Sequence, residues 1–320
     1  TLFPYTTLFR SYMASQTNVR EMIAKNNAKK GGASDKIVPI ILGIISAISI
    51  LTTIAILFTL LTETITFFTR VPYSKFFLTG TWNPTGSNPE YGIWALIIGT
   101  LKITFIATIV SVPIGLGAAI YLNEYASDRT RRIIKPILEI LAGIPTIVFG
   151  FFALTFVTPI LRSIIPGLGE FNSISPGIVV GIMIVPIITS LSEDAMSSVP
   201  NKIREGAYGL GATKFEVATK VVLPAATSGV VASIVLGVSR AIGETMIVSL
   251  AAGSTPTSSL SLTSSIQTMT GYIVEVATGD APFGSDIYYS IYAVGFTLFI
   301  FTIIMNLLSQ WISKRFREEY

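Results

Sequence analysis

The sequence has 320 residues, of which 51% are hydrophobic and only 12% are charged, a balance too apolar for the surface of a soluble domain. It contains no cysteine and no histidine, which excludes disulfides, thiolate nucleophiles, Ser-His-Asp triads and histidine metal sites. The net charge of +4 is explained better by where basic residues lie relative to hydrophobic segments than by nucleic acid binding.

Residues 1–36 precede the first long hydrophobic segment. Residues 1–11 (TLFPYTTLFRS) lack an initiator methionine and the basic start and cleavage site of a signal peptide, so we interpret them as an adapter artefact. Met13 or Met22 is then the expected start. The polar, Lys-rich remainder predicts a cytoplasmic tail.

Six segments are apolar and long enough to cross a hydrocarbon core of about 30 Å, which takes about 20 helical residues. These predicted helices are Ile37–Thr62, Ile93–Leu122, Ile144–Leu161, Gly177–Leu191, Thr227–Ala252 and Tyr288–Ile312. The fourth is short and contains Pro186, which membrane helices tolerate where neighbours satisfy the backbone. We therefore predict an all-α integral membrane protein with six transmembrane helices.

Basic residues are distributed unevenly outside these helices. Seventeen lie in the tail, the second and fourth loops and the C-terminus 314–320, whereas three lie in the other loops. Basic segments stay in the cytoplasm, so both termini are predicted to be cytoplasmic, an N-in/C-in topology. The outer loops 63–92 and 253–287 are rich in Gly, Pro, Ser, Thr and Asn, and fit either a docking face for a soluble partner or solvated connections.

The predicted fourth loop carries a recognisable pattern. Its residues Glu205–Pro224 read EGAYGLGATKFEVATKVVLP. This resembles the signature of ABC importer permeases, which is E-A-A, three residues, G, nine residues, I, one residue and L-P. Gly206 replaces the middle Ala and Val221 replaces Ile. The matching positions are Glu205, Ala207, Gly211, Leu223 and Pro224.

The residues of this loop predict two short helices joined by a turn. The turn is expected around three glycines that lack a Cβ, Gly206, Gly209 and Gly211. Glu216 and Lys220 form a favourable i,i+4 pair on the second helix, which Pro224 is expected to end. The second helix also carries Phe215, Val217, Ala218 and Val222. The alternative reading is an ordinary amphipathic connection on the membrane surface.

The resemblance implies a type I ABC importer permease fold, with 93–313 as the permease domain and 200–224 as the coupling loop that grips an ATPase. The residues expected to couple to the ATPase are Glu205, Gly206, Ala207, Gly211, Leu223 and Pro224. The chain has no G-x-x-x-x-G-K-[ST] segment, so ATP and Mg are expected on a separate ATPase subunit, with no cofactor here.

Arg240 is a charge near the middle of the fifth predicted helix, where insertion costs about 2.5–3.5 kcal/mol. Glu244 follows four residues later, so the two side chains are expected on one face and able to pair. One reading is a structural lock between helices. In the other reading, Arg240 lines a pathway and binds an anion, because the donors of a guanidinium fit two phosphate oxygens. Glu244 would then hold Arg240 when no anion is present.

The segment SRAIGETMIVSLAAGSTP around Arg240 resembles phosphate permeases, specifically the PstC subfamily. GIPTIVFGFFALTFVTPIL and FFLTGTWNPTG resemble the same family, so the similarity covers residue 37 to the C-terminus. It implies phosphate import by alternating access across a prokaryotic plasma (inner) membrane, with Arg240 and Glu244 in the substrate pathway. The implied partners are a PstA-like second permease, a PstB-like ATPase dimer and a PstS-like phosphate-binding protein outside.

Other features have simpler interpretations. Lys102 is expected to reach the membrane interface from the outer end of its helix, or to attract phosphate at the entrance. Glu139 is given no role. The glycines expected to allow close helix packing are Gly99, Gly115, Gly117, Gly150, Gly177, Gly181 and Gly237. The alternatives for function are a permease for molybdate or sulfate, an ion-coupled secondary transporter or a membrane scaffold, and, least of all, an intramembrane enzyme.

Overall fold

The structure is a computed structural model that describes residue 22 and residues 33–315. The proposed adapter and most of the predicted tail lie outside the described residues, as do residues 316–320. The chain divides into two units, Thr1–Thr59 and Leu60–Tyr320, and the helix α2 (Ala33–Arg70) crosses the boundary between them.

The described part of the first unit is the α2 segment that ends at Thr59, and its sequence is almost entirely apolar. The hydroxyl groups of Thr52 and Thr53 donate to the carbonyls of Ile48 and Ser49 one turn earlier. Such bonds satisfy the polar atoms within the helix itself, as a lipid environment requires.

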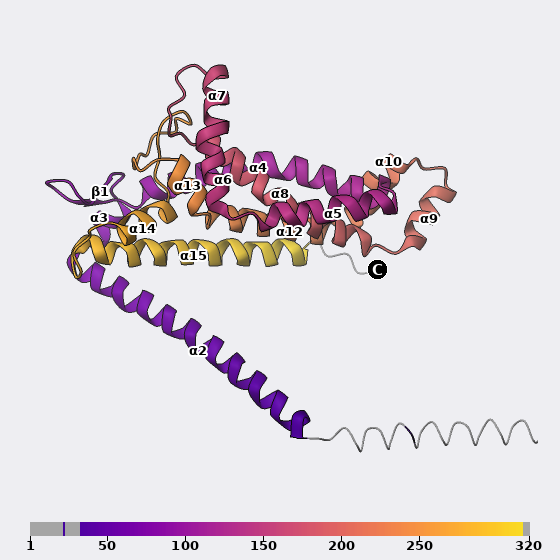
Figure 1. The fold of residues 1–320 in the computed structure, drawn as a ribbon, viewed down its shortest axis with the longest axis horizontal. Helices are drawn as coiled ribbons and strands as arrows, with labels where there is room; N and C mark the ends of the chain where they lie inside the picture. Colours follow the sequence, from indigo (N-terminus) through magenta and orange to yellow (C-terminus); the bar gives the residue numbers. More distant parts are fainter. Residues whose placement is uncertain (1–21, 23–32, 316–320) are drawn as a thin grey trace, which may run out of the picture. The chain divides into compact units, whose positions relative to one another are not determined.

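The second unit is a bundle of long helices. Figure 1 shows α4, α5, α8, α12 and α15 running side by side, with α7 projecting from them. Their bounds are Trp94–Ile120 for α4, Asp128–Gly143 for α5, Ile174–Ser197 for α8, Thr227–Ile242 for α12 and Asp286–Arg315 for α15. A π-helical turn η1 (Tyr121–Tyr125) continues α4. The projecting segment consists of α6 (Thr146–Phe152), the π-helical η2 (Ala153–Val157) and α7 (Thr158–Ile164).

Shorter elements gather at the two ends of this bundle (Figure 1). The hairpin end holds α3 (Tyr73–Phe77), strand β1 (Trp82–Asn83), strand β2 (Glu90–Tyr91) and α14 (Met269–Thr278). The strands pair antiparallel, with Trp82 opposite Tyr91. The other end holds what we call the connector, which consists of α9 (Asn201–Gly209), α10 (Lys214–Glu216), the π-helical η3 (Val217–Val222) and α11 (Leu223–Ala225).

Five helices among the described residues are long and apolar enough to cross a membrane, or six if one bent pair counts as a single span. The bent pair joins Lys214–Ala225 to Thr227–Ile242 at an angle of 76°. The mainly helical membrane fold is therefore confirmed, whereas the number of six spans and the N-in/C-in orientation stay predictions.

Two predicted helices end too early. The first continues past Thr62 to Arg70, whose guanidinium donates to the Gly284 carbonyl at 2.7 Å and pairs with Asp286 at 3.3 Å. The fourth continues past Leu191 to Ser197. Polar residues suggested a loop at both places, but partners from distant segments satisfy their side chains, which allows the helix to continue.

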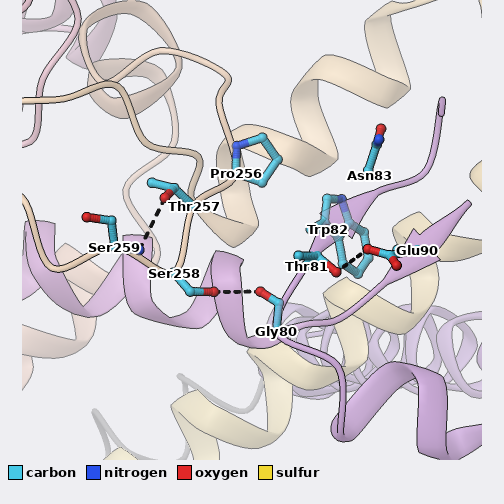
Figure 2. A pocket seen from close by; sticks show the side chains of 9 residues that line it. All are labelled: Gly80, Thr81, Trp82, Asn83, Glu90, Pro256, Thr257, Ser258 and Ser259. Carbon is cyan, nitrogen blue, oxygen red and sulfur yellow. Dashed lines mark hydrogen bonds between the residues drawn. The ribbon is translucent and has the colours of Figure 1, made fainter.

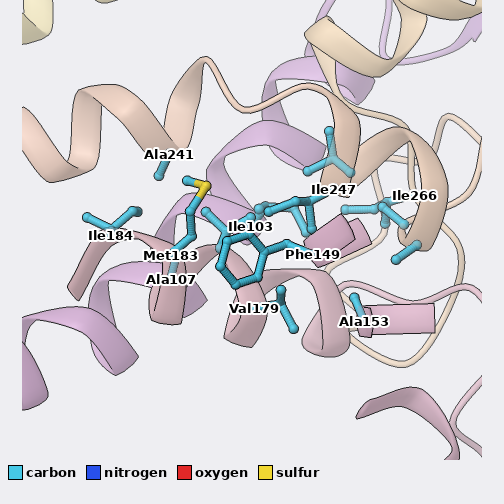
Figure 3. Packing of buried hydrophobic residues seen from close by; sticks show 14 of the residues in the cluster. Ile103, Ala107, Phe149, Ala153, Val179, Met183, Ile184, Ala241, Ile247 and Ile266 are labelled. Atoms are coloured by element: carbon cyan, nitrogen blue, oxygen red, sulfur yellow. The ribbon is translucent and has the colours of Figure 1, made fainter. Parts of the chain in front are cut away.

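A cluster of buried apolar side chains from α4, α6, α8 and α13 (Met246–Ala251) forms the centre of the bundle (Figure 3). Helix α8 lies at its middle, because Val179, Val180 and Ile184 are completely buried. Close approach between α4 and α8 depends on small residues. A Cβ on Gly177 would lie 2.7 Å from Ile106 Cβ, and one on Gly181 would lie 2.8 Å from Val110 Cβ.

The glycine packing prediction is therefore confirmed for Gly177 and Gly181. It is wrong for Gly117, because a Cβ built there meets no atom within 4 Å.

Candidate functional site

The predicted fifth span is interrupted where its charged residues lie. Helix α12 ends at Ile242 and α13 begins at Met246, so Gly243–Thr245 separates two helices. Arg240 stands in the last turn of α12, where a cation interacts favourably with the helix dipole. Its side chain is exposed, and it makes no hydrogen bond or ion pair with any other residue that the structure describes.

Glu244, in contrast, is buried, with 7% of its surface exposed. Its carboxylate Oε1 accepts from the backbone N–H of Ile247 at 3.3 Å, in the first turn of α13. Its backbone carbonyl accepts from the hydroxyl of Thr270 at 2.7 Å. Both contacts direct Glu244 toward α13 and α14, and its carboxylate satisfies an open donor at the start of a helix.

The predicted pairing of Arg240 with Glu244 is therefore wrong for this structure. The expectation assumed one continuous helix, in which residues four apart share a face. The break at Gly243 removes that relation and leaves Arg240 without a counter-ion among the described residues. The assignment of both residues to a substrate pathway stays a prediction.

The connector forms two helical arms joined by a turn, as predicted, but the glycines contribute differently. Gly206 and Gly209 lie within α9, and a Cβ at either would meet no atom within 4 Å. Of these three connector glycines, Gly211 alone has a positive φ, of 86°, which side-chain-bearing residues rarely adopt. Pro224 does not end the second arm, because α11 continues to Ala225 and the bend follows there.

The second arm begins with a capping box that the sequence interpretation missed. The Thr213 hydroxyl accepts from the Glu216 backbone N–H at 3.3 Å, and the Glu216 carboxylate accepts from the Thr213 backbone N–H at 3.1 Å. The T-x-x-E spacing is a recognisable signal for this motif. The predicted pair of Glu216 with Lys220 is confirmed at 3.1 Å.

The pKa of Glu216 is lowered from the usual 4.5 to about 2. The largest cause is the hydrogen bond from the backbone of Thr213, followed by those from Lys220 and from the Thr213 hydroxyl.

One face of the connector is packed against the bundle and the other is open. Val217 and Val222 are completely buried against the ends of α4, α8 and α12. Leu210, in the turn, is 91% exposed, and Phe215 is 66% exposed. Glu205 and Gly206 lie exposed on α9, whereas Ala207 and Leu223 are half-buried. The connector therefore presents an apolar tip on a firmly held base, an arrangement suited to contact with another protein.

At the hairpin end, two loops enclose a cleft of about 740 Å³ (Figure 2). Its walls are residues 80–83 with Glu90 on one side and residues 256–259 on the other. The Ser258 hydroxyl joins the two sides by donating to the Gly80 carbonyl at 2.5 Å.

Lys102 lies below the second of these loops and is buried. Its ammonium donates to the carbonyls of Ser259 and Ser261, the latter at 2.9 Å. Whether this loop lies at the membrane interface or at a phosphate entrance stays a prediction. Lys102 holds the loop against α4, which the sequence could not reveal because backbone carbonyls carry no residue-specific signal. Glu139, for which no role was expected, is exposed.

Among the described residues, no three acidic side chains come together as a metal site would require.

Comparison with known proteins gives a consistent assignment. Residues 111–318 match the family described as binding-protein-dependent transport system inner membrane component. The chain is 35% identical over 235 residues to a probable ABC transporter permease protein, YqgH, of Bacillus subtilis, covering 73% of this chain and 75% of that protein. It is 32% identical over 261 residues to the phosphate transport system permease protein PstC of Mesorhizobium japonicum, covering 75% and 78%.

Solved structures share the fold. A chain of the bacterial alginate ABC transporter, in complex with its alginate-bound periplasmic protein, matches with a TM-score of 0.62 at 16% identity, covering 89% of this chain and 98% of that chain. A chain of the inward-facing MetNI methionine ABC transporter matches with a TM-score of 0.55 at 18% identity, covering 71% and 98%.

Proposed function

Because the chain belongs to the family of inner-membrane components of binding-protein-dependent transport systems, we propose that it is a permease subunit of an ATP-driven phosphate importer. It is a multi-pass protein of the plasma membrane and a transporter subunit rather than an enzyme. Relatives with 29% to 39% identity are named as phosphate transport permeases, which supports phosphate as the cargo.

In the proposed complex, the chain pairs with a second permease of PstA type, while two PstB-like ATPase subunits bind ATP and Mg on the cytoplasmic side. The connector's open face, with Leu210 and Phe215, is the surface that we assign to the ATPase. The cleft at the hairpin end is the surface that we assign to a PstS-like phosphate-binding protein. Both assignments use the predicted N-in/C-in orientation.

The observation that carries the phosphate proposal is the guanidinium of Arg240, which is exposed and has no partner in the part of the chain that the structure describes. Within a membrane bundle, a charge without a counter-ion is costly unless water or a ligand reaches it. Its rigid fork of donors matches two oxygens of a phosphate, and it stays protonated at every physiological pH. Glu244 contributes differently from the expectation, because its carboxylate accepts from the Ile247 backbone N–H at the start of α13 instead of pairing with Arg240.

The test is phosphate uptake by the reconstituted complex of this chain, its permease partner, the ATPase and the binding protein. Arg240→Gln should reduce uptake to background while assembly and basal ATPase activity stay at the wild-type level. Arg240→Lys keeps the charge but loses the fork, so it should retain partial uptake. Arg162→Gln, which changes another exposed arginine, is the matched control and should transport normally. Full uptake by Arg240→Gln would remove Arg240 from the mechanism.

Two further measurements separate the alternatives. Unlabelled molybdate and sulfate should compete poorly with labelled phosphate, whereas strong competition by either would favour a permease for that oxyanion. Uptake that persists without the ATPase subunit would favour an ion-coupled secondary transporter.

A further inference from the structure

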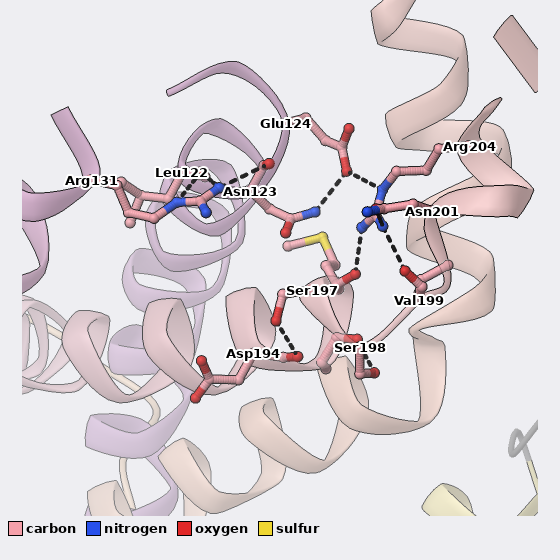
Figure 4. Close-up of polar contacts among 12 residues, drawn as sticks. Leu122, Asn123, Glu124, Arg131, Asp194, Ser197, Ser198, Val199, Asn201 and Arg204 are labelled. Carbon is pink, nitrogen blue, oxygen red and sulfur yellow. Dashed lines mark hydrogen bonds and ion pairs between the residues drawn. The ribbon is translucent and has the colours of Figure 1, made fainter. Parts of the chain in front are cut away.

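Arg204, one residue before the family pattern begins, joins three elements at the connector end (Figure 4). Its Nε donates to the carboxylate of Glu124 on η1 at 3.2 Å. Its Nη2 donates to the Met196 carbonyl in the last turn of α8 at 2.7 Å, and its Nη1 to the Val199 carbonyl at 2.6 Å. The Nη1 atom also donates to Asn201 Oδ1 at the start of α9, at 3.1 Å.

This arrangement is mostly buried, and each nitrogen of the Arg204 guanidinium donates at least one hydrogen bond. The side chains of Arg204 and Glu124 are only 13% and 5% exposed. A buried ion pair is stable only where its remaining polar atoms also have partners, and here each side of the guanidinium fork has one. The Met196 carbonyl lies in the last turn of α8, where it also accepts from the Val199 backbone N–H at 3.2 Å. Removing either charge would therefore leave the other buried without its counter-ion.

A second arginine fixes the helices to which Arg204 is joined. Arg131 on α5 donates to the carbonyls of Leu122 and Asn123, at 2.7 and 3.2 Å, and lies 3.8 Å from the carboxylate of Glu193 on α8. Lys135 pairs with the same carboxylate at 2.5 Å. The ends of α4, α5 and α8 are thus held as one block.

Between that block and α9 the chain has only residues 198–200. If this short segment alone joined them, a force on the connector would be absorbed by bending at the joint. The Glu124–Arg204 pair provides a second connection between α9 and the block. It does so through a residue 80 positions earlier in the chain.

We propose that Arg204 is a positioning residue for energy coupling: with Glu124 it makes α9 move as one body with the ends of α4 and α8. Movement of the ATPase against the connector then reaches the membrane helices. The inference rests on the proposed function, because it assumes a motor that acts on the connector.

The first test uses the complete complex in proteoliposomes and measures phosphate transported per ATP hydrolysed. Glu124→Gln and Arg204→Lys should assemble and hydrolyse ATP at the wild-type rate, but the ratio should fall about fivefold or more. Asp286→Asn is the matched control, because it removes a carboxylate from an arginine pair at the hairpin end. It should leave the ratio unchanged.

The second test needs no substrate. Because the chain has no cysteine, spin labels can be placed at Tyr125→Cys on η1 and Lys202→Cys on α9 in the assembled complex. The distance between the labels should be narrowly distributed in the parent chain, and broad when Glu124→Gln or Arg204→Lys is added. If the parent complex imports no phosphate, the substrate assignment fails, but the label distances still decide whether the pair holds α9.

A wild-type transport ratio in both variants, or a narrow label distance in both, would overturn the proposal. Loss of assembly in both variants would also overturn it, because Arg204 would then serve folding rather than coupling.

Discussion

At the scale of single residues, the surroundings of a basic side chain, rather than its charge, determine its role. Lys102 and Arg240 both lie within the helix bundle, yet Lys102 is buried under two carbonyls and Arg240 is open. A lysine that is already satisfied by backbone acceptors has a structural task, whereas an arginine without partners is available for a ligand.

Glu216 provides a prediction about pH at this scale. Its pKa is lowered to about 2 in the folded state, so its stabilising contribution is complete above the usual value of 4.5 and disappears as the pH falls toward about 2. Hydrogen exchange of residues 213–222, normalised to a free peptide, should therefore show constant protection from about pH 7 to about pH 5.5 and protection that falls progressively as the pH is lowered through about 4.5 toward about 2.

Lys220→Met removes one partner of Glu216, so the loss of protection should move to higher pH. Lys202→Met removes a lysine from the other arm of the connector and should leave the profile unchanged. Identical profiles for the two variants would show that Lys220 does not hold the carboxylate ionised.

At the scale of elements, the contact between α4 and α8 depends on the missing side chains of glycines. Gly181 faces Val110 and the Ala107 carbonyl, so a methyl group there has no room. Because close-packed helices adjust only slightly, added atoms force the helices apart.

Gly181→Ala should therefore lower the free energy of unfolding by about 1–3 kcal/mol, the usual cost of overpacking. Gly117→Ala on α4 is the matched control, because open space surrounds that position. It should be neutral or stabilising by up to about 1 kcal/mol, since alanine favours helix. Thermal unfolding in detergent would measure both, and equal midpoints would contradict tight packing at Gly181.

At the scale of the whole molecule, the hairpin end and the connector lie at opposite ends of the bundle (Figure 1). The predicted orientation places the connector in the cytoplasm and the hairpin outside. Asn83 and Leu210 are both exposed and suit single-cysteine labelling, because the chain has no cysteine of its own.

On intact cells, a membrane-impermeant maleimide should label Asn83→Cys but not Leu210→Cys. After permeabilisation it should label Leu210→Cys as well, and addition of the ATPase should protect that site. The unsubstituted chain provides the background. Labelling of Leu210→Cys on intact cells would contradict both the orientation and the contact with an ATPase.

The sequence alone determined that this is a membrane protein of the ABC permease type. Its apolar segments are long, and its connector pattern lies within one short stretch of the chain. The pairing of Glu216 with Lys220 was also predictable, since both residues stand four apart on one helix. Arg240 could be selected from its charge within an apolar segment, although its lack of a partner among residues 33–315 could not.

Only the tertiary structure decided how the buried charges are satisfied. Lys102 meets carbonyls more than 150 residues later, and Arg204 meets a carboxylate 80 residues earlier. Glu244 binds the start of α13 rather than Arg240, because the helix breaks between them. Helical periodicity relates only neighbouring turns of a continuous helix, so contacts made across a break, or with the backbone of a distant loop, leave no pattern in the sequence.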